Sequence, residues 1–211
     1  MTGPDRPAPD RAKSLADPAA VAARHALVDA AHLAPLRRLS DRIRAEQGAP
    51  VPEADPLDGG VGARLLLLLE TPGPATGRTD FVSRDNPTGT AANLFRFLGQ
   101  AGIARADTLI WNAVPWVIHA PGARNRAPRA GEIRAARPYL GPLLDLMPRL
   151  AVAVLSGRVA GGLRPDLAAA RPGLPVIDVP HPSPTYVCTS PAVAERIAAG
   201  LAEAAAVLRA S

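Results

Sequence analysis

The sequence contains one cysteine, Cys188, among its 211 residues. A single thiol cannot form a disulfide within the chain, and it cannot supply the thiolates of a structural zinc site or an iron–sulfur cluster. A free thiol is typical of a reducing compartment, so we expect a cytoplasmic protein. The four histidines (His25, His32, His119 and His181) are scattered without the spacing of metal ligands. We therefore expect neither a metal nor another cofactor.

Aromatic residues are also scarce, at 3% of the chain, although 47% of the residues are hydrophobic. The core must therefore be built mainly from Leu, Val, Ile and Ala. No apolar run reaches the length of about 18 residues that crosses a membrane, and the amino-terminal stretch is polar where a signal peptide would be apolar. We expect a soluble monomer without membrane contacts, long enough for one domain with a sizeable core.

Lysine is nearly absent, because 23 of the 24 basic residues are arginine. A GC-rich genome produces the same bias, so the arginine content says little about function. The distribution of charge is more informative: residues 1–60 carry a net charge of −1 and residues 61–211 a net charge of +6. A basic folded region is consistent with a phosphate-bearing partner. On charge alone, it is equally consistent with an evenly spread, solvated surface.

Composition divides the chain into three regions. Residues 1–17 are rich in proline and charge and are expected to be disordered. Residues 18–60 are expected to form a helical region, interrupted at Pro35, followed from residue 48 by a linker or surface loop rich in Pro, Gly and acidic residues. Residues 61–211 are expected to form an α/β domain.

Short apolar runs in the third region predict four buried strands, at residues 64–69, 108–111, 150–155 and 176–179. Helical patterns lie between and after them, at residues 90–101, 131–146, 158–170 and 191–209, and Ser190 is expected to cap the last helix. This alternation predicts a three-layer α/β/α sandwich with a central, mostly parallel four-stranded sheet. Ligands bind such sheets at the carboxyl ends of the strands.

Polar groups follow the strands and resemble the motifs of a known family. The first strand is followed by residues 70–73 (Glu-Thr-Pro-Gly), the second by Asn112, and the fourth by residues 181–184 (His-Pro-Ser-Pro). Together with Phe81, these motifs resemble the uracil-DNA glycosylase superfamily over residues 64–209. The resemblance implies a DNA-repair enzyme that flips a deaminated base out of single- or double-stranded DNA and hydrolyses its N-glycosidic bond.

The resemblance also implies roles for single residues. The base is expected to be bound by Thr71, Pro72, Gly73, Phe81, Asn112 and Ser183. Phe81 would supply a stacking face, with an ordinary core aromatic as the alternative. Asn112 carries a donor and an acceptor, so it can pair with uracil O4 and N3–H, whereas cytosine presents the reversed pattern. His181, as a neutral imidazole, would donate to uracil O2 while the base departs, with a structural loop histidine as the alternative.

The group that orients the attacking water is not settled by the resemblance. One branch of the family uses an acid where this chain has Thr71, and another uses an aspartate shortly after the stacking phenylalanine. Asp85 lies in that second neighbourhood and is the first choice, Glu70 is its rival, and each also fits an ordinary loop residue. Because Thr71 has no carboxylate, a non-catalytic nucleic-acid-binding protein that keeps the fold is the alternative function.

Two further departures concern specificity and cofactor. Gly73 stands where the uracil-strict branch carries a tyrosine that blocks the thymine methyl, so a wider range of bases is expected. The iron–sulfur branch needs four cysteines, which excludes a cluster-bearing member. DNA contacts are expected from the basic stretch after Trp116 and from the turn beside His181, where relatives push a wedge into the duplex; the residues are Arg124, Arg126, Arg129, Pro184 and Tyr186.

Overall fold

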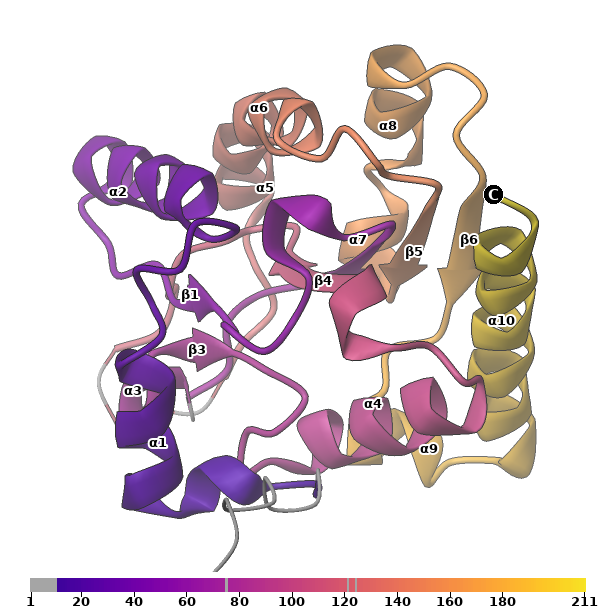
Figure 1. The fold of residues 1–211 in the computed structure, drawn as a ribbon, viewed down its shortest axis with the longest axis horizontal. Coiled ribbons are helices and arrows are strands. Elements are labelled where there is room, and N and C mark those ends of the chain that lie inside the picture. The colour runs from indigo at the N-terminus through magenta and orange to yellow at the C-terminus, as the bar shows by residue number, and fades with distance from the viewer. Residues whose placement is uncertain (1–10, 75, 121, 124) are drawn as a thin grey trace, which may run out of the picture.

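The computed structural model describes residues 11–211 except residues 75, 121 and 124 (Figure 1). Its centre is a parallel four-stranded sheet in the order β4-β2-β5-β6. The strands are β2 (Leu65–Leu69), β4 (Thr108–Asn112), β5 (Val152–Ser156) and β6 (Val176–Val179). Each lies within two residues of an apolar run in the sequence, so the predicted α/β class with a four-stranded parallel sheet is confirmed.

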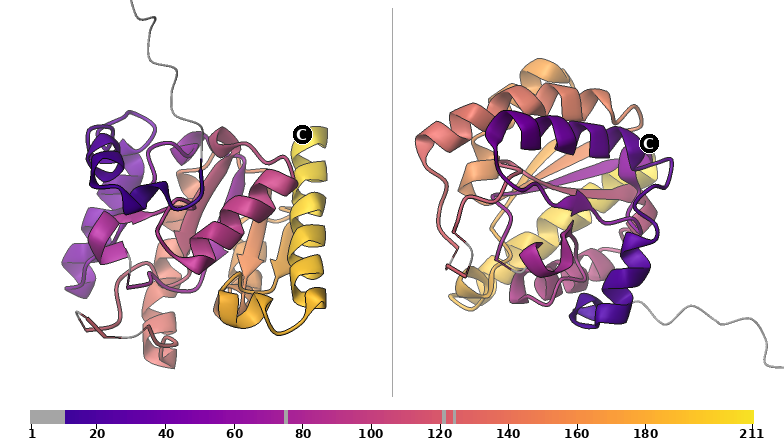
Figure 2. Two further views of the ribbon diagram at one scale, coloured as in Figure 1. Left: turned by 90° about the horizontal axis from the view of Figure 1, so that it is seen from below. Right: turned by 90° about the vertical axis from the view of Figure 1, so that its left-hand side faces the viewer.

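Helices cover both faces of the sheet, which makes three layers (Figure 2). In β2, Leu66 and Leu68 face one layer and Leu65 and Leu67 the other, because successive side chains of a strand point to opposite faces. The first layer consists of α2 (Ala34–Gln47), α5 (Ala130–Ala136), α6 (Leu140–Asp145), α7 (Arg158–Gly161) and α8 (Arg164–Ala170). The second consists of α4 (Gly89–Gln100) and α10 (Pro191–Ala210), and Ser190 caps α10 by accepting the Ala192 N–H.

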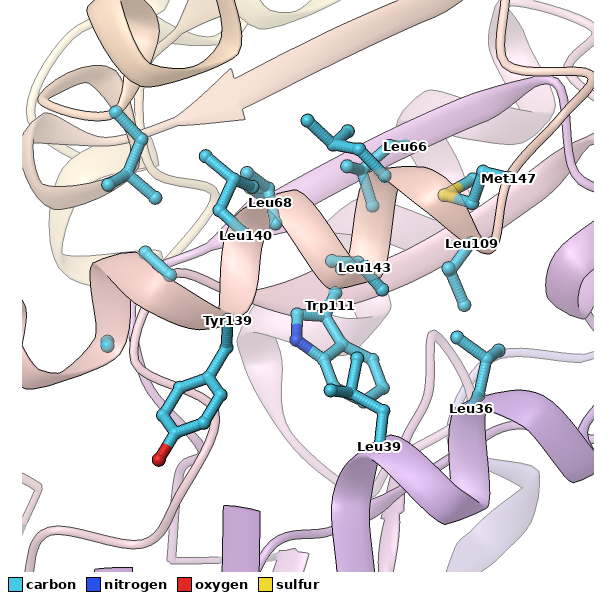
Figure 3. Close-up of a cluster of buried hydrophobic side chains, with 14 of the residues drawn as sticks. Leu36, Leu39, Leu66, Leu68, Leu109, Trp111, Tyr139, Leu140, Leu143 and Met147 are labelled. Carbon is cyan, nitrogen blue, oxygen red and sulfur yellow. The ribbon is translucent and has the colours of Figure 1, made fainter. Parts of the chain in front are cut away.

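The first layer includes a helix from the N-terminal region. Side chains of the sheet, of α6 and of α2 meet in one buried cluster (Figure 3), which includes Leu66, Leu68, Leu109, Trp111, Leu140, Leu143, Leu36 and Leu39. Burying a large apolar side chain contributes about 1.5–3 kcal/mol, so α2 is held to the domain by a substantial hydrophobic contact. Among the described residues, no helix is both long and apolar enough to cross a membrane.

Short elements complete the chain: η1 (Ser14–Ala16), α1 (Pro18–His25), η2 (Gly60–Gly62), α3 (Thr76–Thr79), η3 (Arg105–Asp107), η4 (Arg137–Tyr139) and α9 (Pro184–Val187). The disorder expected for residues 1–17 does not hold for η1. Leu15 is 3% exposed and its N–H donates to the Asp85 carbonyl oxygen at 3.1 Å. Leu15 is thus an apolar residue in a polar run, and it is buried against parts of the chain that are distant in the sequence. Residues 1–10 lie outside the described residues.

The segment expected to be a linker or surface loop, residues 48–60, is largely buried. Within it, β1 (Glu53–Ala54) pairs in parallel with β3 (Phe81–Val82) to form a separate two-stranded sheet. Asp55 and Asp58 are only 1% and 3% exposed. The prediction was wrong because acidic residues and prolines are typical of loops, whereas here the carboxylates meet buried arginines from distant parts of the chain.

Candidate active site

A cleft of about 920 Å³ opens where the strands of the main sheet end. This volume and this position are usual for a small-molecule site in an α/β protein. The segments after β2, β3, β4, β5 and β6 all contribute to its lining, which includes Glu70, Thr71, Pro72, Gly73, Ser83, Asn86, Asn112, Arg126, Arg158, His181, Ser183 and Tyr186. The structure therefore brings together most of the residues that the sequence places at the strand ends.

Asn112 is the last residue of β4 and is 4% exposed. Among the described residues, nothing forms a hydrogen bond with its buried Oδ1 atom. Leaving such an acceptor without a partner costs about 1–3 kcal/mol. Asn112 itself lines the cleft, so its side-chain amide lies beside the space that a ligand would enter.

His181 follows β6 and lies between two prolines. Its Nδ1 accepts the backbone N–H of Ser183 at 3.2 Å, which requires the tautomer protonated at Nε2. Burial lowers the pKa of His181 below its usual 6.5, and the nearby Glu70 carboxylate partly opposes that shift. The imidazole is therefore neutral at pH 7, carries its proton on Nε2 and lines the cleft.

Glu70, the first residue of the segment 70–73 that follows β2, lies beside His181. Its Oε1 accepts the backbone N–H of Val159 at 3.2 Å. Gly157 makes this arrangement possible: its φ is +92°, and an added Cβ would lie 2.6 Å from Glu70 Oε1 and 3.2 Å from His181 Cβ. Among the described residues that line the cleft, Glu70 is the only acidic one. In the same described ranges, no three His, Cys, Asp or Glu side chains are grouped as metal ligands would be.

Asp85 does not line the cleft, and the prediction that it orients the attacking water is wrong. Its side chain is fully buried and accepts hydrogen bonds from Arg24 Nη2 at 2.6 Å and from Arg105 Nη1 at 3.0 Å. The loop after β3 turns this carboxylate away from the cleft, toward arginines that lie 61 and 20 residues away in the sequence. Both arginines hold the carboxylate outside the cleft lining.

Phe81 is also absent from the cleft, so the predicted stacking face is not found there. Its ring is fully buried and lies with its centroid 4.9 Å from that of the His25 ring on α1. The alternative, an ordinary core aromatic, describes this residue. Val82 and Asn86 of the same loop do line the cleft, and Asn86 holds the loop by donating to the Phe81 carbonyl oxygen at 2.8 Å and accepting from Thr79 Oγ1 at 2.7 Å.

The other predicted base contacts are in the cleft. Thr71, Pro72 and Gly73 line it, and a Cβ added to Gly73 would meet no atom of the described residues within 4 Å, its chain neighbours aside. The part of the chain that the structure describes therefore leaves open the space in which a bulkier residue would stand. Ser183 also lines the cleft, with its hydroxyl 2.9 Å from Thr185 Oγ1.

The expected DNA-binding arginines differ from one another. Arg124 lies outside the described residues. Arg126 lines the cleft, but its guanidinium is bonded to the Glu132 carboxylate and the Ile118 carbonyl oxygen, so it holds its own loop. Arg129 is exposed, and its backbone N–H donates to Glu132 at 2.6 Å.

Arg158, Tyr186 and Pro184 lie in or next to the cleft lining. Arg158, which the sequence analysis missed, is exposed, begins α7 and lines the cleft. Its position directly after the strand-end residues Ser156 and Gly157 is the signal that could have identified it. Tyr186 in α9 is 52% exposed and lies with its ring centroid 6.5 Å from that of His181, on the rim of the cleft. Pro184 begins α9 and packs closely on Gly89, outside the lining itself.

Fold and cleft together define a class: a parallel α/β/α protein with an amide, a neutral imidazole and a carboxylate gathered at the carboxyl ends of its strands. The family model described as the Uracil DNA glycosylase superfamily matches residues 58–201, which is more than half of the chain. The chain therefore belongs to the uracil-DNA glycosylase superfamily. Membership indicates a DNA glycosylase and implies DNA as the substrate. A comparison with curated proteins finds no match.

Proposed function

We propose that this protein removes uracil from DNA by hydrolysing the N-glycosidic bond of a flipped nucleotide. One observation carries the proposal: Asn112, whose Oδ1 has no partner among the described residues, and His181, whose ring proton is on Nε2, line the same cleft. Asn112 Oδ1 would accept uracil N3–H while its amide nitrogen donates to O4. Cytosine has no proton on N3, so it would leave the buried Oδ1 unpaired, and this would weaken its binding.

The chemistry assigns distinct tasks to His181 and Glu70. As the C1′–N1 bond breaks, its electron pair moves onto the uracil ring and negative charge develops at O2, which Nε2–H of His181 would stabilise. The sugar becomes cationic, and a water oxygen bonds to C1′. Glu70 replaces Asp85 in our assignment, because its carboxylate can hold that water, accept its proton and stabilise the cationic sugar.

The open space at Gly73 supports a wider range of bases. A panel of oligonucleotides tests both the activity and its range, with uracil, hypoxanthine, xanthine or a thymine mismatch at one position and alkali-sensitive cleavage as the readout. We expect cleavage at uracil. Binding of every oligonucleotide without cleavage of any would instead support the non-catalytic nucleic-acid-binding protein.

Glu70→Gln is expected to lower single-turnover excision of uracil by about two orders of magnitude, which is the usual scale of a lost general base. The substitution keeps the shape of the side chain and removes its charge. Glu195→Gln, at an exposed position of α10, is the matched control and should keep the parent rate. A Glu70→Gln rate within about threefold of the parent would assign the water to backbone groups or to Asn86.

DNA affinity should depend on Arg158 through a phosphate contact. Arg158→Ala is expected to reduce the slope of log affinity against log salt by about 0.9 on duplex DNA. Arg209→Ala removes the same charge from an exposed position at the end of α10 and should leave the slope unchanged. Equal slopes for both variants would show that Arg158 acts only through net charge.

A further inference from the structure

Six charged residues from four separate segments form a buried cluster behind the cleft. Three are arginines and three are aspartates, so their charges balance when all are ionised: Arg24 of α1, Asp55 and Asp58 after β1, Arg84 and Asp85 after β3, and Arg105 of η3. No side chain of this ion cluster is more than 15% exposed. The proposed reaction uses none of these groups.

Arg24 joins two aspartates that belong to different segments. Its Nε donates to Asp55 Oδ1 at 2.9 Å and its Nη2 to Asp85 Oδ2 at 2.6 Å. Arg105 bridges the same two carboxylates from the other side, with donor–acceptor distances of 3.0 Å to each. Buried ion pairs add little net stability, because desolvation offsets attraction, but removing one partner leaves an uncompensated charge. An arrangement of this kind therefore fixes geometry more than it stabilises the fold.

Ser83 connects the ion cluster to the cleft. Its hydroxyl donates to Asp55 Oδ2 and accepts the backbone N–H of Asp85, the latter at 2.9 Å, while Ser83 itself lines the cleft. Val82 and Asn86 of the same loop also line the cleft. On its outer side the loop accepts the Leu15 N–H at the Asp85 carbonyl oxygen. The N-terminal region thus holds the backbone of this cleft wall from behind.

We propose that Arg24 is a positioning residue: through Asp55 and Asp85 it fixes residues 82–86 as the cleft wall against which the flipped nucleotide is held. The N-terminal helix α1 is then part of the active site, although it contributes no side chain to the cleft lining. This inference rests on the proposed function of the cleft. It predicts that the loss of Arg24 impairs the chemical step more than the binding of DNA.

The protonation of Asp58 gives a second test of the role of Arg24. Burial raises its pKa to about 7, while Arg84 and Arg105 oppose the shift and Asp55 and Asp85 add to it. Without Arg24, an ionised Asp58 leaves the ion cluster one negative charge in excess, whereas a protonated Asp58 restores the balance. A variant that lacks the arginine should therefore be more impaired at pH 8 than at pH 6.

The test compares Arg24→Met, Arg24→Lys and the control Arg42→Met. Arg42 lies on α2 and pairs with Glu46 at the surface, away from the ion cluster. The readouts are the single-turnover rate at saturating enzyme, the affinity for uracil DNA, and backbone hydrogen exchange of residues 82–86, all at a temperature where each variant is folded. We expect Arg24→Met to lower the rate about tenfold or more with DNA affinity within about twofold, since small misplacements of substrate are costly.

Arg24→Lys should recover part of the rate, because it keeps the charge but cannot bridge both carboxylates. Exchange at residues 82–86 should rise in Arg24→Met and stay at the parent level in Arg42→Met. A folded Arg24→Met with the parent rate and parent exchange would overturn the inference. If the parent itself fails to excise uracil, the proposed function fails, and the exchange of residues 82–86 still decides whether Arg24 positions the wall. If Arg24→Met does not fold, the same two readouts on Arg24→Lys decide.

Discussion

Asn112→Ala is expected to lower single-turnover excision of uracil by about three orders of magnitude, the largest effect of any substitution in the cleft. The side chain would lose both hydrogen bonds to the base at once. It would also lose the buried acceptor that currently has no partner among the described residues and that uracil N3–H would satisfy. Rates at saturating enzyme, with uracil in single-stranded and in duplex oligonucleotides, measure this loss.

Two controls separate base recognition from folding. Asn112→Asp keeps the shape of the side chain but presents oxygen in place of the amide donor, so uracil O4 would face a carboxylate and the loss should persist. Thermal unfolding of each variant shows whether β4 and its neighbours remain intact. Excision at the parent rate by a folded Asn112→Ala variant would rule out Asn112 as the base-reading residue.

His181→Ala should slow the chemical step by about two orders of magnitude or more, which corresponds to the loss of one donor to a developing oxyanion. Affinity for uracil DNA should change little, because this bond strengthens only as the base departs. A rate loss that disappeared at saturating enzyme would instead mean that His181 only binds the substrate.

The pH dependence of the excision rate gives an independent test of the role of His181. Burial lowers the pKa of His181 below 6.5, so the neutral donor is present at pH 7 and is lost only as the pH falls through that lowered value. Protonation would also place an N–H on Nδ1, where Ser183 now donates. The acid limb of the rate should therefore lie below pH 6.5. In Glu70→Gln it should lie lower still, because the Glu70 carboxylate raises the pKa of His181. An unchanged limb in that variant would mean that another group controls it.

The sequence alone was sufficient to predict the sheet and most of the residues that line the cleft. The run at residues 65–69 is apolar without interruption because both faces of β2 are buried, and such runs distinguish parallel strands from amphipathic ones. Parallel strands end at one edge of the sheet. Glu70, Asn112 and His181, which are far apart in the sequence, therefore had to lie close together once their strands were recognised.

Side-chain directions in the loop between β3 and α4 could not be predicted from the sequence. Phe81, Ser83, Asp85 and Asn86 are near neighbours in the sequence, yet Ser83 and Asn86 line the cleft while Phe81 and Asp85 are buried away from it. No periodic pattern governs side-chain direction in an irregular segment.

Only the tertiary structure decided these directions, because the partners that set them are distant in the sequence. Arg24 and Arg105 hold the Asp85 carboxylate, and His25 packs on Phe81. Asp55 and Asp58 also depend on distant partners. Their acidic character predicts an exposed linker, but in the structure they pair with Arg24 and Arg105. A buried charge is stable only with its partner in place, and local sequence does not identify a partner that folding brings from elsewhere in the chain.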